Sequence, residues 1–337
     1  MKSFKFNNRL RLISQLFFLF LTIWIGIEFF FYYNFLYTEG KTFYIPRPSG
    51  VEAFLPISSI MNLLYWVISG ELSLVHPAGV FILISILIIS LVFKKSFCSW
   101  VCPVGFVSES LGEYGKKIFG KNLKIIKFLD YPLRSLKYLL LMFFLYAIFS
   151  MSVNSLYSFL ESPYNKIADI KMLLFFMNMS KFTAIVLIVL VIASIFIYNF
   201  WCRYLCPYGA LLGIISYFSP FKIRRNKETC TDCKACTGIC PSYILVHKLD
   251  VVKSDECMSC LKCSSVCPVS NTLEYKLIKS KINFDSKKLI FGILILYFGI
   301  IFFAMISGLW KSSVSDFEYM RHVKNLNSFI YSHPSGF

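Results

Sequence analysis

The chain has 337 residues, of which 57% are apolar, 18% aromatic and only 16% charged. Ordinary globular chains are about 45–50% apolar and about 25% charged, so this composition indicates an integral membrane protein. It excludes a disordered chain, a coiled coil and a secreted disulfide scaffold. The net charge of +17 would indicate nucleic-acid binding only if it gathered on a soluble domain.

Five apolar stretches qualify as membrane-spanning helices, which need about 20 mostly apolar residues. They predict an all-α polytopic membrane protein with about five transmembrane helices. The first stretch is no cleavable signal peptide, because its apolar run is too long and no small-residue cleavage pattern follows it. The stretches are Leu12–Tyr33, Ala78–Phe93, Leu136–Val153, Thr183–Phe200 and Leu289–Leu309.

Lys and Arg are distributed unevenly between the segments that these stretches separate. Residues 1–13, 94–138 and 199–288 carry 4, 9 and 14 of the 35, whereas the three alternating segments carry 2, 3 and 3. The positive-inside rule therefore places the N-terminus in the cytoplasm and the C-terminal tail outside a cytoplasmic (inner) membrane. The basic charge is thus a topology signal that also attracts the anionic lipid bilayer, and no nucleic-acid partner is expected.

These features divide the chain into eight predicted segments. A polar, cysteine-rich composition separates residues 214–286 from the apolar segments around them. The segments are a cytoplasmic N-terminus with the first span (1–35), an outer loop with an interfacial segment (36–77), the second span (78–110), a basic cytoplasmic loop (111–135), the third and fourth spans (136–213), an inserted cytoplasmic domain (214–286), the fifth span (287–310) and an outer tail (311–337).

Eight of the 12 cysteines lie in the inserted domain, in two runs of identical spacing, Cys-x2-Cys-x2-Cys-x3-Cys-Pro. Bacterial two-cluster ferredoxins have this spacing, and the fourth cysteine of each run ligates the other cluster. A small α+β ferredoxin-like domain with two 4Fe-4S clusters is therefore predicted. Zinc sites also use Cys-x2-Cys but have no need of the third cysteine or the trailing proline, and a reducing cytosol disfavours disulfides. The predicted ligands are Cys230, Cys233, Cys236 and Cys267 for cluster 1, and Cys257, Cys260, Cys263 and Cys240 for cluster 2.

The other four cysteines belong to an internal repeat. Phe97–Gly105 matches Trp201–Gly209 at an offset of 104 residues, and each copy contains Cys-x3-Cys-Pro. The i, i+4 spacing would put both sulfurs of a pair on one helical face, with the following proline ending the helix. Neighbouring basic residues would favour the thiolate form. The cysteines are Cys98, Cys102, Cys202 and Cys206, and the basic residues are Lys94, Lys95 and Arg203.

Several functions are open to this quartet. If the two copies pack together, four thiolates converge on one shared metal or on an additional iron-sulfur cluster. Alternatively, each pair is a redox dithiol or binds a soft ion such as Cu(I). Buried structural thiols are the plainest explanation. The twofold recurrence with proline and glycine attached favours a shared site, without selecting its metal.

Two ionisable residues are candidates for proton or quinone chemistry. Glu28 lies within the first apolar stretch, where it would accept a proton from a quinol or, as an interfacial residue, reach headgroup water. His76 begins the second stretch and would line a quinone pocket with Glu52 or Glu71, although capping or loop packing also explains it. The spans hold no histidine pair for haem, and no fingerprint for flavin or nicotinamide is present.

The chain resembles a known group, the membrane-bound 4Fe-4S polyferredoxins of the NapH type and the C-terminal half of NosR-type proteins. The resemblance rests on the two Cys-x3-Cys-Pro copies followed by the two-cluster insert, and on Arg47–Glu52, His76–Gly79 and Ser162–Asn165. It covers the chain from about Arg47 to about Leu273. It implies electron transfer between the quinone pool and a redox partner protein, whereas the fifth span and the long outer tail depart from the NapH pattern.

These observations predict a membrane-bound iron-sulfur protein that passes single electrons between the quinone pool, or a cytoplasmic donor, and a respiratory redox partner. The clusters would do the redox chemistry and the protein would supply ligation and tuning. The alternative is a maturation factor that reduces a metal centre for a respiratory enzyme. A redox-sensing regulator lacks an output domain in this sequence, and a transporter is disfavoured because the span interiors carry almost no charge.

Overall fold

The computed structural model describes residues 2–277, 283–326 and 328–331. Parts of three predicted segments lie outside the described residues, namely residue 1 of the N-terminal segment, 278–282 of the inserted domain, and 327 and 332–337 of the outer tail. The chain forms two compact units. The first contains Met1–Phe20, Ile86–Met142 and Ile185–Leu296, and the second contains Leu21–Ser85, Phe143–Ala184 and Tyr297–Phe337.

Most of the described chain is helical, as predicted, and three helices are long and apolar enough to cross a membrane. They are α1 (Lys2–Tyr37), α6 (Lys127–Phe149) and α14 (Ser286–Ile306), and they coincide with the first, third and fifth predicted spans. A bent pair, α9 (Ala168–Met177) and α10 (Lys181–Phe196), would make a fourth.

The second and fourth predicted spans correspond to shorter helices. Helix α3 (Pro77–Phe93) has 17 residues and α10 has 16. Left-handed backbone follows both helices, at Lys94 (φ 61°) and Asn199 (φ 56°), because the chain must turn there into the cysteine repeats. The structure therefore contains three or four candidate spans among its described residues, where the composition predicts five.

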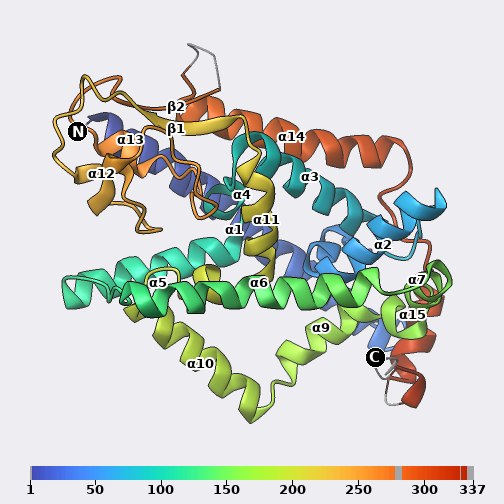
Figure 1. Cartoon of the computed structure of the whole chain (residues 1–337). Coiled ribbons are helices and arrows are strands. Elements are labelled where there is room, and N and C mark those ends of the chain that lie inside the picture. The colour runs from blue at the N-terminus through green and yellow to red at the C-terminus, as the bar shows by residue number, and fades with distance from the viewer. Residues whose placement is uncertain (1, 278–282, 327, 332–337) are drawn as a thin grey trace. The chain divides into compact units, whose positions relative to one another are not determined.

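The first unit contains the inserted domain and both copies of the repeat. Its two strands form an antiparallel sheet in which Phe221 faces Leu277, and α12 and α13 lie close to that sheet (Figure 1). The structure thus contains a small two-stranded sheet among its helices. The elements are α4 (Phe97–Trp100), α5 (Pro103–Phe119), the π-helical turn η2 (Trp201–Leu205), α11 (Pro207–Tyr217), β1 (Phe221–Arg225), α12 (Ala235–Gly238), η3 (Val246–Lys248), α13 (Lys262–Val266) and β2 (Leu273–Leu277).

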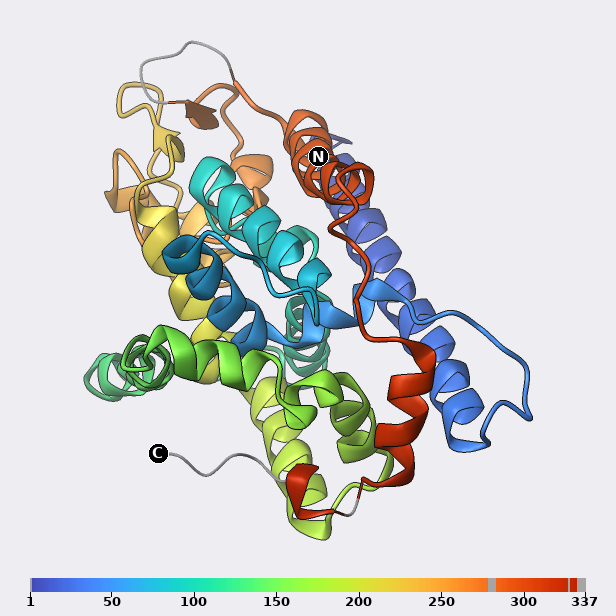
Figure 2. The same ribbon diagram turned by 90° about the vertical axis from the view of Figure 1, so that its right-hand side faces the viewer.

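The second unit packs short helices around the C-terminal half of α1. The predicted interfacial segment forms α2, which starts with a proline at its first position and ends at Gly70 in left-handed conformation (φ 77°). The predicted tail includes α15, the red helix that follows α14 through an extended segment (Figure 2). The elements are η1 (Ser49–Phe54), α2 (Pro56–Ser69), α7 (Val153–Leu160), α8 (Pro163–Lys166), α9, α15 (Asp316–Lys324) and η4 (Phe329–Tyr331).

A buried arginine joins the parts of the second unit. Arg47 Nη1 lies 2.8 Å from Glu52 Oε1, and Arg47 Nη2 lies 2.8 Å from Asp169 Oδ2. Both carboxylate side chains are fully buried. The guanidinium also lies over the ring of Tyr319 on α15, 5.6 Å from its centroid. One cation therefore compensates two carboxylates that burial would otherwise make costly.

Replacing Arg47 with Met should destabilise the protein by about 3–5 kcal/mol, because two buried carboxylates would lose their counter-charge. Thermal unfolding in detergent, followed by circular dichroism, measures this. Lys324→Met is the matched control, since it breaks an exposed pair with Glu39 and should cost no more than about 1 kcal/mol. Equal melting temperatures for the two variants would contradict the role given to Arg47.

Candidate iron-sulfur sites

The two cysteine runs of the inserted domain adopt the same backbone conformation. Left-handed residues occur at Asp232 and Lys234 in the first run and at Ser259 and Leu261 in the second, with φ between 47° and 60°. These are equivalent positions, two and four residues after the first cysteine of each run. Non-glycine residues adopt such angles at a cost of about 1–3 kcal/mol, and only where the surroundings require it. Both loops are therefore bent in the same way around their cysteines.

Two separate cavities divide the eight cysteines into two groups of four. Each cavity combines three cysteines of one run with the fourth cysteine of the other, which is the crossed grouping that the spacing predicts. Each group contains four sulfur donors, the number that a 4Fe-4S cluster takes from protein. Cavity 1 is lined by Cys230, Cys233, Cys236 and Cys267. Cavity 2 is lined by Cys240, Cys257, Cys260 and Cys263.

The donor sets differ from those of a single metal ion. In the part of the chain that the structure describes, no three His, Cys, Asp or Glu side chains are arranged to hold one ion. In a 4Fe-4S cluster, by contrast, each cysteine binds a different iron, so the sulfurs stand further apart. The two cavities therefore fit iron-sulfur clusters in the identity and the number of their donors.

Cavity 1 lies near the surface of its unit. Cys233 is exposed, and Arg225 Nη1 lies 3.6 Å from the sulfur of Cys230. His247 also lines this cavity, and its Nδ1 lies 2.7 Å from the hydroxyl of Thr237. A group bound here would be accessible to a partner, and the guanidinium of Arg225 would stabilise its negative charge.

Partial burial affects the thiols of cavity 2. Burial raises the pKa of Cys240 to about 12, and it also raises the pKa of Cys263 well above the ordinary thiol value. Without iron these thiols are therefore neutral at physiological pH, and ligation would have to supply the positive charge that ionises them.

A buried charge network lies against cavity 2. Glu109 on α5 accepts a hydrogen bond from Arg11 Nη1 (3.0 Å) and pairs with Lys262 Nζ (2.8 Å). Burial opposes ionisation of Glu109, but Arg11 and Lys262 outweigh it and hold the pKa of this carboxyl at about 2. Since Arg11 and Lys262 also interact electrostatically with Cys260, the network places two positive charges beside a predicted ligand. No local pattern of the sequence points to these residues, because they lie far apart along the chain.

Both turns of the repeat hold the loops that line cavity 2. In the first copy, Ser99 Oγ donates to the carbonyl oxygen of Met258 (2.7 Å) and Trp100 Nε1 donates to that of Ser259 (3.1 Å). In the second copy, Arg203 Nη1 donates to the carbonyl oxygen of Ser242 (3.0 Å). The donors lie between the cysteines of each pair, so the repeat is fastened directly to the inserted domain.

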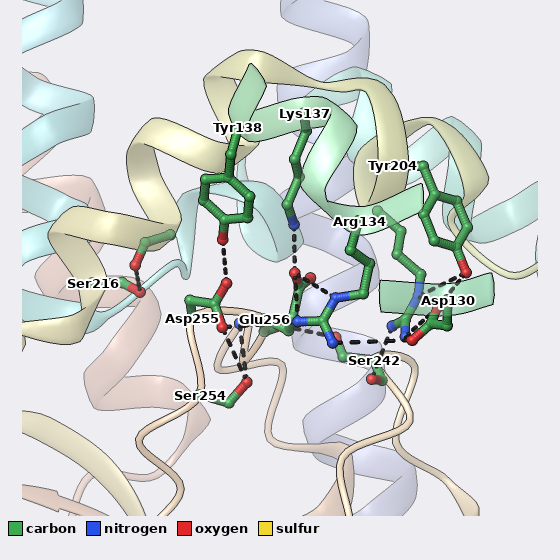
Figure 3. Close-up of polar contacts among 12 residues, drawn as sticks. Asp130, Arg134, Lys137, Tyr138, Tyr204, Ser216, Ser242, Ser254, Asp255 and Glu256 are labelled. Atoms are coloured by element: carbon green, nitrogen blue, oxygen red, sulfur yellow. Dashed lines mark hydrogen bonds and ion pairs between the residues drawn. The ribbon is translucent and has the colours of Figure 1, made fainter. Parts of the chain in front are cut away.

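One face of α6 holds the segment that precedes Cys257 (Figure 3). Lys137 and Arg134 both pair with Glu256, the latter at 3.1 Å, and Tyr138 donates to Asp255. Burial disfavours ionised Glu256, but Lys95, Lys137 and Arg134 outweigh burial and lower its pKa to about 2. The loop of cavity 2 is therefore anchored immediately before its first cysteine.

The cysteines of the repeat do not lie on the helical faces that the i, i+4 spacing predicts. Cys98 lies in α4, whereas Cys102 is the N-cap of α5 and its sulfur accepts a hydrogen bond from the Gly105 N–H (3.5 Å). Cys206 caps α11 in the same way through Gly209 (3.2 Å). Proline at the first position of each following helix favours this arrangement, so Pro103 and Pro207 begin a helix rather than merely end one.

Burial opposes the predicted thiolate form in the cysteines of the first copy when no metal is bound. Burial raises the pKa of Cys98 to about 12 and that of Cys102 to about 11. Two of the basic residues expected to oppose this effect are engaged elsewhere. Arg203 pairs with Asp130 at 2.8 Å, and Lys94 donates to the carbonyl oxygen of Ser254 at 2.7 Å.

Close helix packing brings the two copies of the repeat together. A Cβ at Gly115 on α5 would overlap the carbonyl oxygen of Ile195 on α10, the helix that leads into the second copy. Next to this contact, the Leu123 N–H donates to the carbonyl oxygen of Phe196 (2.9 Å). Glycine is required here because the two backbones are in contact.

The candidate quinone residues lie in different surroundings. Glu28 on α1 is partly buried, and it has no hydrogen bond or ion pair with any residue that the structure describes. His76 is 2% exposed, and its Nε2 donates to the carbonyl oxygen of Asn165 (2.7 Å). Its Nδ1 faces Arg47 Nη2 at 3.3 Å. Both nitrogens of His76 are thus engaged within the protein.

Two family descriptions match this chain. One, a 4Fe-4S binding domain, matches residues 75–122 and 181–226, which contain the two copies of the repeat. The other, a 4Fe-4S dicluster domain, matches residues 222–268. Over 313 residues the chain is 44% identical to the putative electron transport protein YccM of Escherichia coli (strain K12), covering 91% of this chain and 88% of the relative. The chain belongs to this family of membrane-associated 4Fe-4S ferredoxin-type proteins.

More distant members of the family match shorter regions. The ferredoxin-type protein NapH of Haemophilus influenzae is 26% identical over 47% of this chain and 51% of the relative. The regulatory protein NosR of Stutzerimonas stutzeri is 28% identical over 48% of this chain but only 22% of the relative. No solved structure matches the chain. The predicted resemblance to NapH and NosR is therefore confirmed, together with ferredoxin-type electron transport as the family's function.

Gly115→Ala should destabilise the protein by about 1–3 kcal/mol, because the added methyl group would force α5 away from α10. Gly26→Ala is the control, since a Cβ at this other helical glycine would meet nothing within 4 Å. Thermal unfolding in detergent should therefore show a lower melting temperature for the first variant only. A melting temperature of Gly115→Ala at or above that of the unaltered protein would show that α5 and α10 are not held in contact.

Proposed function

We propose that this protein is a membrane-bound electron carrier whose inserted domain holds two 4Fe-4S clusters. The observation that carries this proposal is the crossed division of eight cysteines between two cavities. Cys230, Cys233, Cys236 and Cys267 would ligate cluster 1, and Cys257, Cys260, Cys263 and Cys240 would ligate cluster 2. When bound, each cluster would accept and release one electron.

The residues around the two cavities would have different roles. Those at cavity 1 would contact a partner protein, and those at cavity 2 would surround the bound group with charge. The exposed Cys233 makes cavity 1 the side at which a redox partner protein would dock. Around cavity 2, the network of Arg11, Glu109 and Lys262 supplies positive charge. Positive charge near a ligand stabilises the reduced, more negative state of an iron-sulfur centre. The reduction potentials of the two clusters would therefore differ.

We further propose five membrane spans, with the shorter helices α3 and α10 crossing as the second and fourth. The N-terminus and the inserted domain would face the cytoplasm and α15 would lie outside, as the distribution of Lys and Arg favours. The mostly apolar composition of α3 and α10 supports this proposal, and their polar ends would be accommodated by local thinning of the bilayer.

Anaerobically purified protein should contain about eight iron and eight acid-labile sulfide atoms from the inserted domain, since each of two clusters holds four of each. Cys236→Ser and Cys263→Ser should each abolish the electron paramagnetic resonance signal of one cluster in the reduced protein. Thr237→Ser, which keeps the hydroxyl beside cavity 1, is the control and should retain both signals. Stoichiometric zinc without iron would refute the proposal.

Quinone is the electron donor or acceptor that we propose within the bilayer, with Glu28 as the proton acceptor. Its carboxylate lies in a membrane-spanning helix, which favours a functional role. His76 is the second candidate, although a quinone would have to displace its contact with Asn165.

Glu28→Gln should lower the rate of quinol oxidation at least tenfold at unchanged cluster content, because the amide cannot accept a proton. His76→Ala tests the second candidate, and Glu39→Gln, which removes one charge of an exposed ion pair with Lys324, is the control. The assay uses purified protein, a soluble quinol and a chemical electron acceptor. Unchanged rates for Glu28→Gln and His76→Ala would remove both residues from the quinone site.

A genetic experiment separates the electron carrier from the alternative maturation factor. Deleting the gene and then supplying the mature respiratory enzyme should leave electron transfer impaired if the protein is a carrier. Full recovery would instead support a role in maturation.

A further inference from the structure

Helix α5 exposes a stripe of apolar side chains. The buried face of this helix consists of small and polar residues, whereas the apolar residues follow the spacing i, i+3, i+7, i+10 and i+14, which places them together on another face. Four of these five are exposed, among them Tyr114 (57%) and Ile118 (55%). Folding therefore buries the polar face of α5 and leaves the apolar stripe uncovered. The buried residues are Gly105, Ser108, Glu109, Gly112 and Gly115, and the stripe consists of Val104, Val107, Leu111, Tyr114 and Ile118.

The chain after α5 exposes further large apolar side chains. Leu123 and Ile126 lie between α5 and α6. Phe128, which is 87% exposed, begins the part of α6 that is apolar enough to cross a membrane. Large apolar side chains that gather on a surface indicate contact with another apolar phase or with a partner. We call the stripe and these three residues together the α5 surface.

Contacts with α10 place the end of α5 beside the end of a candidate membrane helix. Gly115 packs against the carbonyl oxygen of Ile195, and the rings of Phe119 and Phe196 stack with their centroids 5.1 Å apart. Ile195 and Phe196 are the last residues of α10, which belongs to the bent pair that qualifies as a span. The last turn of α5 therefore lies where α10 would leave the hydrocarbon.

Lysines gather at the same end of α5. Lys116, Lys117 and Lys121 are exposed, and none of them has a hydrogen bond or an ion pair with any residue that the structure describes. The two carboxylates of α5, those of Glu109 and Glu113, are already paired with other cations. The three ammonium groups are thus without counter-ions within the described chain, beside a surface that is otherwise apolar.

We propose that α5 lies in the cytoplasmic surface of the bilayer, with its stripe against the acyl chains and with Lys116, Lys117 and Lys121 bound to anionic phospholipid headgroups. A basic helix with one apolar face binds a membrane surface in this way, because long lysine side chains reach the headgroups while the apolar face stays in lipid. Residues 111–121 of the predicted basic cytoplasmic loop would then lie in the interface. The choice of leaflet rests on the orientation proposed above.

Other occupants fit the α5 surface less well. An acidic protein would pair with the lysines but leave the stripe in water. A second copy of this chain would cover the stripe but bring two sets of uncompensated lysines together. Only an anionic bilayer offers acyl chains and negative charge side by side, and it already surrounds the neighbouring helices α6 and α10.

Photo-crosslinking tests what covers the stripe. The full chain with Tyr114→benzoylphenylalanine is reconstituted in vesicles of phosphatidylglycerol and phosphatidylcholine, irradiated and analysed by mass spectrometry. The expected product is one chain bound to one phospholipid. Leu249→benzoylphenylalanine is the matched control, since Leu249 is an exposed apolar residue of the inserted domain and should give little lipid product. A product of two chains, or a lipid yield at Tyr114 no higher than at Leu249, would overturn the proposal.

The lysines are tested by lipid selectivity. Delipidated protein in detergent should gain more in melting temperature from phosphatidylglycerol than from phosphatidylcholine. Lys116→Gln with Lys117→Gln should lose at least half of this difference. Lys248→Gln with Lys253→Gln removes the same charge from exposed positions of the inserted domain and should retain it. Equal losses in the two double variants, or no selectivity in the unaltered protein, would overturn the headgroup site. Iron content measured on the same samples keeps this result separate from the proposed electron transfer, which would stand if both clusters were present.

Discussion

The contact on which the first unit depends is the buried pairing of Glu256 with Lys137 and Arg134. Glu256 directly precedes Cys257, and its carboxylate is buried against α6. The cost of burying this charge is offset only while both cations stay in place. The pairing therefore fixes where the second cysteine loop begins, and with it the position of cavity 2.

The repeat has a structural role that its cysteines alone do not suggest. Its two turns provide donors for backbone carbonyl groups in the cavity 2 loops, from Ser99 and Trp100 in one copy and Arg203 in the other. Buried carbonyl groups need such partners. The same turns carry the quartet, so the geometry that fastens the inserted domain also sets the distance between the two groups of cysteines.

In each unit a buried charge is compensated by two side chains of opposite charge. In the first, Glu109 lies between Arg11 and Lys262, and in the second Arg47 lies between Glu52 and Asp169. Such networks stabilise little in total, because desolvation cancels much of the attraction, but they penalise every arrangement in which a charge is unpaired. They therefore select one packing of helices whose apolar faces alone would permit several.

The sequence by itself determined the two cysteine runs, their crossed grouping and the long apolar helices, because these follow from local spacing and local hydrophobicity. It also contains a local signal for α15, the capping box Ser315-x-x-Glu318, in which Ser315 Oγ accepts a hydrogen bond from the Glu318 N–H (3.2 Å). Only the tertiary structure decided that Arg11 meets Glu109 and that the second cysteine of each repeat copy caps a helix. The first contact joins residues that are about 100 positions apart, and the second depends on a turn between two helices. Neither follows from the local periodicity of the sequence.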